Sequence, residues 1–237
     1  MPAPATPHTS KGYDEALESA RDLVLQMGAR VSRQLEDALE CLSSGSAQLI
    51  DQVMRHESAI NELERSIDAL VGQTIARHQP AAGDLRLLIA LVKVTTDLER
   101  IGDEAKKIAL QARRIGWEGR SRPHRQAPIR RMARITLDML QRALAALERL
   151  DAQGAVEVMR QDEEVNEMFR TILRQLITYM IEDPRTISTC LDVAFISKSL
   201  ERVGDHATNI FEHAVYAAEG KDVRHAPLGE VERALGS

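Results

Sequence analysis

Apolar residues recur at intervals of three and four positions along most of this chain, which is the spacing of one face of an α-helix. Alanine, leucine, glutamate and arginine dominate, and aromatic residues make up only 3% of the sequence, a mixture that favours helices over sheets. The prolines lie at or outside the ends of the periodic stretches, as long uninterrupted helices require. The pattern predicts helices at 13–42, 47–78, 84–115, 129–150, 155–181 and 184–219.

The second half of the sequence repeats the first. The segment Leu-Glu-Arg-Ile-Gly-Asp at 98–103 returns as Leu-Glu-Arg-Val-Gly-Asp at 200–205, 102 positions later. Val-Met-Arg at 53–55 returns at 158–160, 105 positions later. Agreement across several helices indicates an internal duplication. We therefore expect an all-α fold of two tandem three-helix bundles, in which short loops make consecutive helices antiparallel neighbours.

Breaks in the pattern divide the chain into these repeats. The stretch 116–128 contains two glycines and two prolines and is predicted to be a linker. The first residues are rich in proline, alanine, serine and threonine without an apolar run, so they are typical of a flexible end rather than of a secretory signal. The expected divisions are a flexible N-terminus at 1–12, repeats at 13–115 and 129–220 around the linker, and a C-terminal tail at 221–237.

The last helix of each repeat carries an apolar seam with alternating steps of four and three residues. Seams of this length bury one face of a helix in antiparallel three-helix packing. The same pattern suits association between chains, so we also expect a homodimer. The candidate core residues are Leu87, Leu91, Val94, Leu98, Ile101, Ala105, Ile108 and Ala112 in the first repeat, and Val193, Ile196, Leu200, Val203, Ala207, Ile210 and Ala214 in the second.

Charge and composition exclude several classes of protein. A formal net charge of −5 argues against a protein that coats nucleic acid, because phosphate contacts need a dense face of lysine and arginine. No apolar run is long enough to span a bilayer, and we expect a cytoplasmic protein that reaches a membrane only through its partners. The two cysteines, Cys41 and Cys190, lie among helical residues and are predicted to be buried thiols.

An acidic motif stands beside each seam and points away from it. A glutamate and an aspartate four residues apart project from the same side of a helix, and a glycine precedes each aspartate. Each glycine costs about 1 kcal/mol relative to alanine inside a helix, so we expect that a neighbouring group needs the room. The motif residues are Glu99, Gly102 and Asp103 in the first repeat, and Glu201, Gly204 and Asp205 in the second.

The preceding helix of each repeat offers partners for these carboxylates. Glu57 and Asn61 are four residues apart, as are Asp162 and Asn166, and both pairs lie off their own seam. Neighbouring helices run antiparallel, and for one handedness of the bundle the two oxygen-rich stripes then face one another across a surface groove. Oxygen ligands without cysteine or paired histidine suit hard cations such as Mg²⁺, Mn²⁺, iron or Ca²⁺. The eight residues are candidate metal ligands, and a solvated face paired with arginine is the alternative.

At these residues the chain resembles the PhoU family of phosphate-specific transport accessory proteins. The resemblance rests on the segments 98–103 and 200–210, and 173–187 is similar to proteobacterial members. It implies two three-helix bundles with surface metal sites at the acidic motifs. It further implies repression of the phosphate-starvation response, together with the phosphate ABC transporter ATPase and the phosphate-sensing histidine kinase. Asn61 and Asn166 stand where some members place aspartate, which lowers the charge of each site.

The sequence predicts a regulatory adaptor rather than an enzyme, with no catalytic residue. It has no glycine-rich phosphate loop, no Ser/His/Asp arrangement and no Glu-x-x-His pair of the kind that di-iron bundles use. A metal-binding bundle with metal-dependent enzymatic activity is the competing function. Among the remaining polar residues, His206 has Glu104 as its counterpart and is not expected to be a shared ligand, and His213 is expected at the surface. Asn209 is a candidate extension of the acidic stripe, although its counterpart in the first repeat is Lys107.

Overall fold

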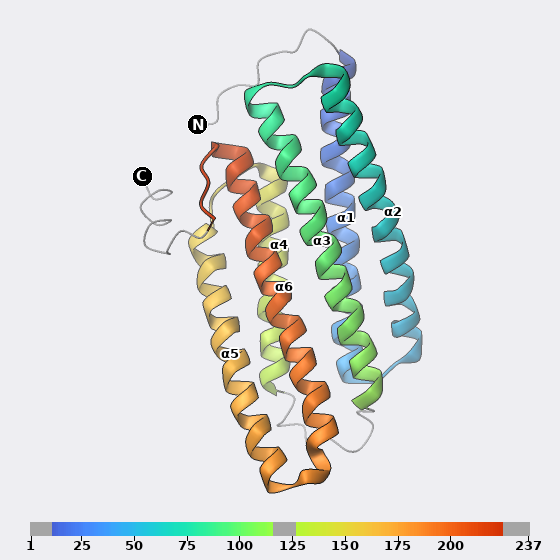
Figure 1. The fold of residues 1–237 in the computed structure, drawn as a ribbon, viewed down its shortest axis with the longest axis vertical. Coiled ribbons are helices and arrows are strands. Elements are labelled where there is room, and N and C mark those ends of the chain that lie inside the picture. Colours follow the sequence, from blue (N-terminus) through green and yellow to red (C-terminus); the bar gives the residue numbers. More distant parts are fainter. Residues whose placement is uncertain (1–10, 116–126, 225–237) are drawn as a thin grey trace.

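A computed structural model describes residues 11–115 and 127–224, and helices account for nearly all of them (Figure 1). Most of the flexible N-terminus, of the linker and of the C-terminal tail that the sequence predicts lies outside these described residues, and the predicted N-terminal residues 11–12 belong to α1. The helices agree with the predicted ranges within three residues at each end. They are α1 (Lys11–Ser44), α2 (Ala47–His78), α3 (Ala82–Ile115), α4 (Ala127–Arg149), α5 (Ala155–Glu182) and α6 (Ile187–Glu219).

The helices form two layers of unequal width. In Figure 1, α5, α6, α3 and α2 stand side by side in front, and α4 and α1 lie behind them. Each repeat is a three-helix bundle, α1–α3 or α4–α6, and the two bundles join chiefly through α3 against α6, the most extensive contact between any two helices. The helices α2 and α5 therefore lie at the two outer edges of the molecule. The third helix of the same repeat lies beside each of them, α3 beside α2 and α6 beside α5.

Both predicted seams are buried, which confirms the predicted core. Every seam residue of α6 is buried, and so is every seam residue of α3 except Leu87, which is partly buried. Because α3 and α6 also pack against one another, the seams are covered within a single chain. A dimer, if it forms, must use other surfaces.

The corner between α5 and α6 differs slightly from the prediction. The sequence predicts Asp183 as a cap with Pro184 in the first turn of an α-helix. The structure instead has a short 3₁₀ turn, η2 (Pro184–Thr186), before α6 begins at Ile187. The Asp183 carboxylate still caps this turn, because its Oδ1 accepts a hydrogen bond from the Arg185 backbone N–H at 3.1 Å.

The two cysteines are buried free thiols, as predicted. Burial, together with the neighbouring carboxylates of Asp37 and Glu40, raises the pKa of Cys41 to about 11. A thiol with so high a pKa is a packing residue rather than a nucleophile.

Candidate functional site

The acidic residues of each repeat gather where its second and third helices approach one another. We call Glu57, Asn61, Glu99 and Asp103 the first acidic site, and Asp162, Asn166, Glu201 and Asp205 the second acidic site. The motif glycine lies at the point of approach in both. A Cβ added to Gly102 would lie 3.5 Å from Glu57 Oε2, and one added to Gly204 would lie 3.5 Å from Asp162 Oδ1. The structure thus brings the predicted residues of α2 and α3, and those of α5 and α6, together.

Glu57 is more deeply placed than the sequence indicates. The expectation of a surface carboxylate is wrong, because Glu57 is only 7% exposed. Gln34 of α1 reaches beneath it and donates from Nε2 to Glu57 Oε2 at 3.1 Å and to the Val53 carbonyl at 3.2 Å. This contact depends on how α1 crosses α2, which the periodicity of either helix alone does not reveal.

A lysine neutralises part of the first acidic site. Lys106 Nζ lies 3.4 Å from Glu57 Oε1 and 4.0 Å from Asp103 Oδ1, between the two carboxylates. It lies one turn beyond the motif on α3, a position that sequence reasoning about the carboxylates did not consider. Lys106 therefore stands where a cation would be expected to bind.

The rest of the first acidic site keeps an excess of negative charge. Burial raises the pKa of Glu99, and the charges of Asp103, Glu64 and Glu57 raise it further. The side-chain Oδ1 of Asn61 is buried and has no hydrogen-bond partner within 11–115 and 127–224. The site therefore remains electronegative on its Glu99 side, away from the Lys106–Glu57 ion pair.

The second acidic site has the same backbone frame but different neighbours. The counterpart of Gln34 is Met139, 105 positions later, and the counterpart of Lys106 is Thr208, 102 positions later. A thioether and a hydroxyl thus replace an amide and an ammonium group. Met139 Cε lies 3.6 Å from a Cβ added to Gly204, so an apolar group lines the floor where the first repeat has a polar one.

With these neighbours, the negative charge of Asp162 is poorly compensated. Burial and the charges of Asp205 and Glu201 together raise its pKa to about 6, and the nearby Thr208 acts in the opposite direction. Asn166 Nδ2 donates to Asp162 Oδ2 at 3.2 Å, whereas Oδ1 makes no hydrogen bond of ordinary geometry with any described residue. A carboxylate with a raised pKa and an orphaned buried oxygen is a place that favours a cation.

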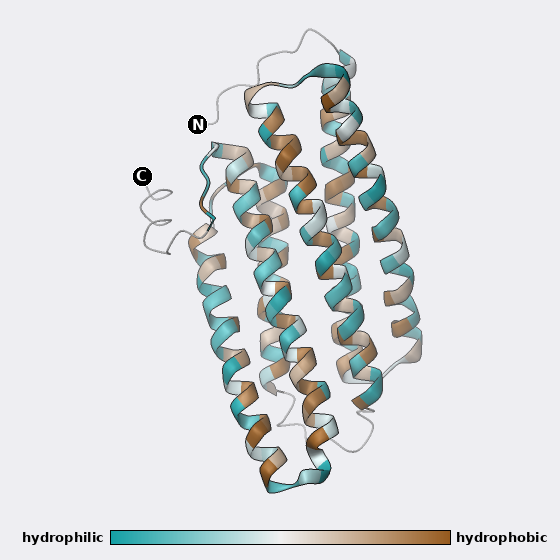
Figure 2. Ribbon diagram, in the orientation of Figure 1, coloured by the Kyte–Doolittle hydropathy of each residue, from teal (hydrophilic) through white to brown (hydrophobic). Residues whose placement is uncertain are grey.

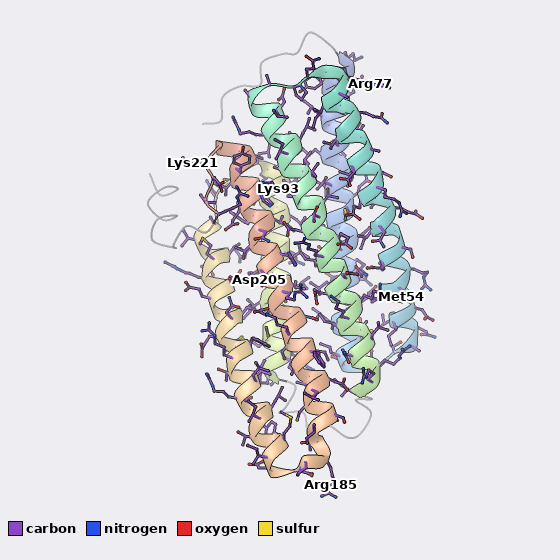
Figure 3. All side chains as sticks on the ribbon, in the orientation of Figure 1. Met54, Arg77, Lys93, Arg185, Asp205 and Lys221 are labelled. Carbon is purple, nitrogen blue, oxygen red and sulfur yellow. The ribbon has the colours of Figure 1, made fainter. Side chains whose placement is uncertain are left out.

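Asp205 completes the second acidic site from about midway along α6 (Figure 3). Asp205 is exposed as a whole, but partial desolvation of its carboxylate and the charge of Glu201 raise its pKa. Lys198, one turn before the motif, pairs with Glu201 rather than with either aspartate. Asp162 and Asp205 thus repel one another without the intervening ammonium group that the first repeat provides.

The described side chains supply hard oxygen donors but no preformed metal cage. Within 11–115 and 127–224, no group of three or more His, Cys, Asp or Glu side chains is placed so as to hold a metal ion. The sites are therefore open surface clusters of carboxylate and amide oxygens. Their chemistry suits a weakly held hard cation more than a structural metal.

A separate polar cluster joins the two repeats, and it corrects the expectations for two residues, His213 and Asn209. Asp97 of α3 accepts from Asn209 at 3.2 Å and lies 2.9 Å from His206 Nδ1 and 3.5 Å from His213 Nε2. Both histidines are buried, so the expected surface position of His213 is wrong. Asn209 serves this cluster rather than the acidic stripe. The bonds that these groups make hold the pKa of Asp97 near 2 against the opposing effect of burial.

Comparison with known proteins places both repeats in one family. The PhoU domain family matches residues 24–112 and 129–214, which are the helical cores of the two bundles. The chain belongs to the PhoU family. The PhoU homolog of a Burkholderia species, named a phosphate-specific transport system accessory protein, is 44% identical over 92% of this chain and 93% of its own length. The PhoU protein of Escherichia coli K12, with the same description, is 37% identical over 96% of this chain and 94% of its own.

Solved PhoU structures share the fold. The crystal structure of PhoU from Pseudomonas aeruginosa matches with a TM-score of 0.84 at 42% identity, over 88% of this chain and all of that one. The phosphate transport system regulatory protein PhoU from Streptococcus pneumoniae matches with a TM-score of 0.79 at 25% identity, over 89% of this chain and 99% of that one. These PhoU proteins are named as accessory and regulatory proteins and not as enzymes, in agreement with the non-catalytic role expected from the sequence.

None of the described helices is long and apolar enough to cross a membrane.

Proposed function

We propose that this chain is a cytoplasmic regulatory adaptor of phosphate homeostasis. It represses the phosphate-starvation response when phosphate is plentiful, and it modulates uptake by contacting the phosphate ABC transporter ATPase and the phosphate-sensing histidine kinase. The observation that supports this proposal is membership of the PhoU family over both repeats, with relatives named as accessory to phosphate-specific transport. The described surface carries two open clusters of acidic residues, and we expect it to serve binding rather than catalysis.

A clean deletion tests the regulatory role. Cells without this protein should express phosphate-scavenging genes at high phosphate, and a plasmid copy should restore repression. Unchanged reporter expression in the deletion strain would contradict the proposal. Affinity purification from phosphate-replete cells should recover the transporter ATPase and the sensor kinase, and these should be missing from a mock purification.

Binding of a hard metal cation at the acidic sites is a second part of the proposal. The residues fit such an ion best in the second repeat, where burial and the charges of Asp205 and Glu201 raise the pKa of Asp162, and partial desolvation and the charge of Glu201 raise that of Asp205. Asp162 Oδ1 is also buried and has no hydrogen-bond partner among the described residues. A cation there would relieve their mutual repulsion and fix the side chains of α5 relative to α6. In the first repeat, Lys106 already performs part of this role for Glu57.

Self-association as a homodimer also belongs to the proposal. The buried seams cannot provide the contact, so any dimer must form through the outer faces of the layers. Light scattering at micromolar concentration distinguishes a dimer from the 26.4 kDa chain.

A further inference from the structure

The free end of the second repeat exposes a continuous run of large apolar side chains. Ile177 and Ile181 on α5 are 53% and 76% exposed, and Ile187, Leu191 and Phe195 on α6 are 42%, 45% and 57% exposed. We call these five residues the apolar tip. Successive members on each helix are four positions apart, so they form one stripe along each helix face. Figure 2 shows hydrophobic residues gathered on the same ends of α5 and α6.

The two stripes lie on the neighbouring antiparallel helices α5 and α6, and we call the exposed surface along the junction of these two helices the α5–α6 groove. The contact between Lys198 of α6 and Phe169 of α5 shows which residues of the two helices lie opposite one another, because Lys198 Nζ is 5.4 Å from the centre of the Phe169 ring. About two turns towards the corner from this pair, Ile177 of α5 comes opposite Leu191 of α6. About two turns in the other direction, the same groove reaches Asp162 and Asp205. The groove therefore has an apolar end and an acidic end.

The first repeat shows that the fold does not require this surface. The counterparts of the apolar tip are Gly72, Ala76, Leu85, Ile89 and Lys93. Only Ile89 among these is a large exposed apolar side chain, at 38%. Exposed apolar stripes in a monomer usually mark an interaction surface, because they otherwise invite aggregation. The second repeat thus carries a feature beyond what three-helix packing needs.

The charges around the groove indicate the chemistry of its occupant. The cations near the apolar tip already have partners in this chain: Arg185 pairs with Asp183 at 3.1 Å, and Arg174 with Glu167 at 3.2 Å. At the other end, Asp205 is exposed and forms no ion pair with any described residue, and Asp162 beside it is partly buried. An anionic lipid surface would be repelled there, whereas a cationic side chain would be attracted.

We propose that the α5–α6 groove binds an amphipathic helix of a partner protein, with its apolar side on the apolar tip and a lysine or arginine at one end paired with Asp205. From Ile187 to Phe195, α6 rises about 12 Å, so the apolar part accepts about two turns of such a helix. The added helix lies on the side of α5 and α6 away from α4 and completes a four-helix arrangement. This inference rests on the proposed adaptor function and names its docking surface.

Site-specific photo-crosslinking in phosphate-replete cells tests the groove. A photo-activatable phenylalanine analogue at Leu191 in the full chain should give an adduct with another protein. Mass spectrometry should place the crosslink in a helical segment with apolar residues every three to four positions and a basic residue at one end. The matched control places the analogue at Ile89, the same position of the first repeat, and should give little adduct. Asp205→Lys should lower the Leu191 adduct by about tenfold through charge repulsion.

Several outcomes would overturn the inference. They are equal adducts at Leu191 and Ile89, adducts only with a second copy of this chain or with lipid, and an adduct that Asp205→Lys does not change. Phe195→Glu should also derepress the phosphate reporter, with thermal stability unchanged because the side chain is exposed. If Phe195→Glu represses normally in a strain where deletion derepresses, the groove proposal fails and the adaptor function stands. If deletion itself has no effect, the adaptor function fails.

Discussion

The two acidic sites share a backbone frame and differ in how their charge is balanced. In the first, Gln34 and Lys106 hold the buried carboxylate of Glu57 by a hydrogen bond and an ion pair. In the second, the equivalent positions are Met139 and Thr208, and Asp162 keeps a pKa raised to about 6. Duplication has thus preserved the positions of the carboxylates while their neighbours have changed.

This difference shows that an acidic motif does not by itself define a cation site. A buried carboxylate is stable when a partner within the chain satisfies its charge, and otherwise it favours either a proton or an external cation. Lys106 neutralises part of the charge of the first acidic site, whereas Thr208, its counterpart in the second, carries no charge. The outcomes expected below follow from this contrast.

The largest expected effect is on metal affinity when the ammonium group is moved between repeats. Thr208→Lys places a cation beside Asp162, so Mn²⁺ should bind the second acidic site about tenfold to hundredfold more weakly. Lys106→Thr removes the competing charge from Glu57 and Asp103, so binding at the first acidic site should strengthen. Titration calorimetry and elemental analysis of the wild type and both variants measure this. Identical Mn²⁺ affinity in all three proteins would show that neither cluster is a metal site.

The second effect concerns the free energy of unfolding in the absence of metal. Neutralising the buried carboxylate should raise this free energy in the second repeat and lower it in the first. Asp162→Asn removes a buried charge and keeps an amide that can accept from Asn166. In chelator at pH 7.5 this variant should be about 1–2 kcal/mol more stable than the wild type, a figure reduced from the full pKa shift because the site is partly solvated. Glu57→Gln instead breaks the ion pair with Lys106 and should destabilise the fold by about 1 kcal/mol. Chemical denaturation provides both values.

The pH dependence separates this explanation from a general effect of the substitution. The folded-state pKa of Asp162, about 6, lies above its value in the unfolded chain, so the folded state retains a proton that the unfolded state releases. The contribution of Asp162 to stability is therefore full below about pH 4 and is lost as pH rises through about 6. The advantage of Asp162→Asn should vanish near pH 4. An advantage that is constant from pH 4 to 8 would exclude the titration of Asp162 as its cause.

Periodicity predicts most of this architecture, because local sequence determines which face of a helix is apolar. The seams of α3 and α6, the duplication and the meeting of carboxylates from adjacent helices all follow from spacing. The burial of Glu57 does not follow from spacing, because it depends on Gln34, which reaches it from α1. The periodicity of one helix does not reveal how another helix packs across it.

The junction between the repeats shows the same limit. A histidine on a helix face has the same spacing whether solvent or a second bundle covers it, so the burial of His206 and His213 against Asp97 becomes visible only once α3 packs on α6. The apolar tip was missed for a related reason. Ile177 and Leu191 fit the helical pattern as well as core residues do, and only their exposure in the folded chain distinguishes them.

The smallest expected effect tests how closely the helices approach at the motif glycines. The sequence predicts that both glycines make necessary room, but the structure supports this strongly only in the first repeat. A Cβ at Gly102 would lie 3.0 Å from Gln34 Oε1, whereas the nearest contacts of a Cβ at Gly204 are at 3.5 Å, an ordinary van der Waals distance. Gly204→Ala should therefore stabilise the protein by about 0.5–1 kcal/mol through helix propensity alone.

The equivalent substitution in the first repeat, Gly102→Ala, is the matched comparison for Gly204→Ala. The methyl group would push Gln34 away from its bonds to Glu57 and the Val53 carbonyl, so the gain in helix propensity should be cancelled or reversed. Because Gln34 holds Glu57 from below, Gly102→Ala combined with Gln34→Met, which copies the floor of the second repeat, should recover part of the loss. Thermal melts of the single and double variants measure the coupling. Equal stabilisation by alanine at both glycines would show that Gln34 moves freely and that the two sites are equally roomy.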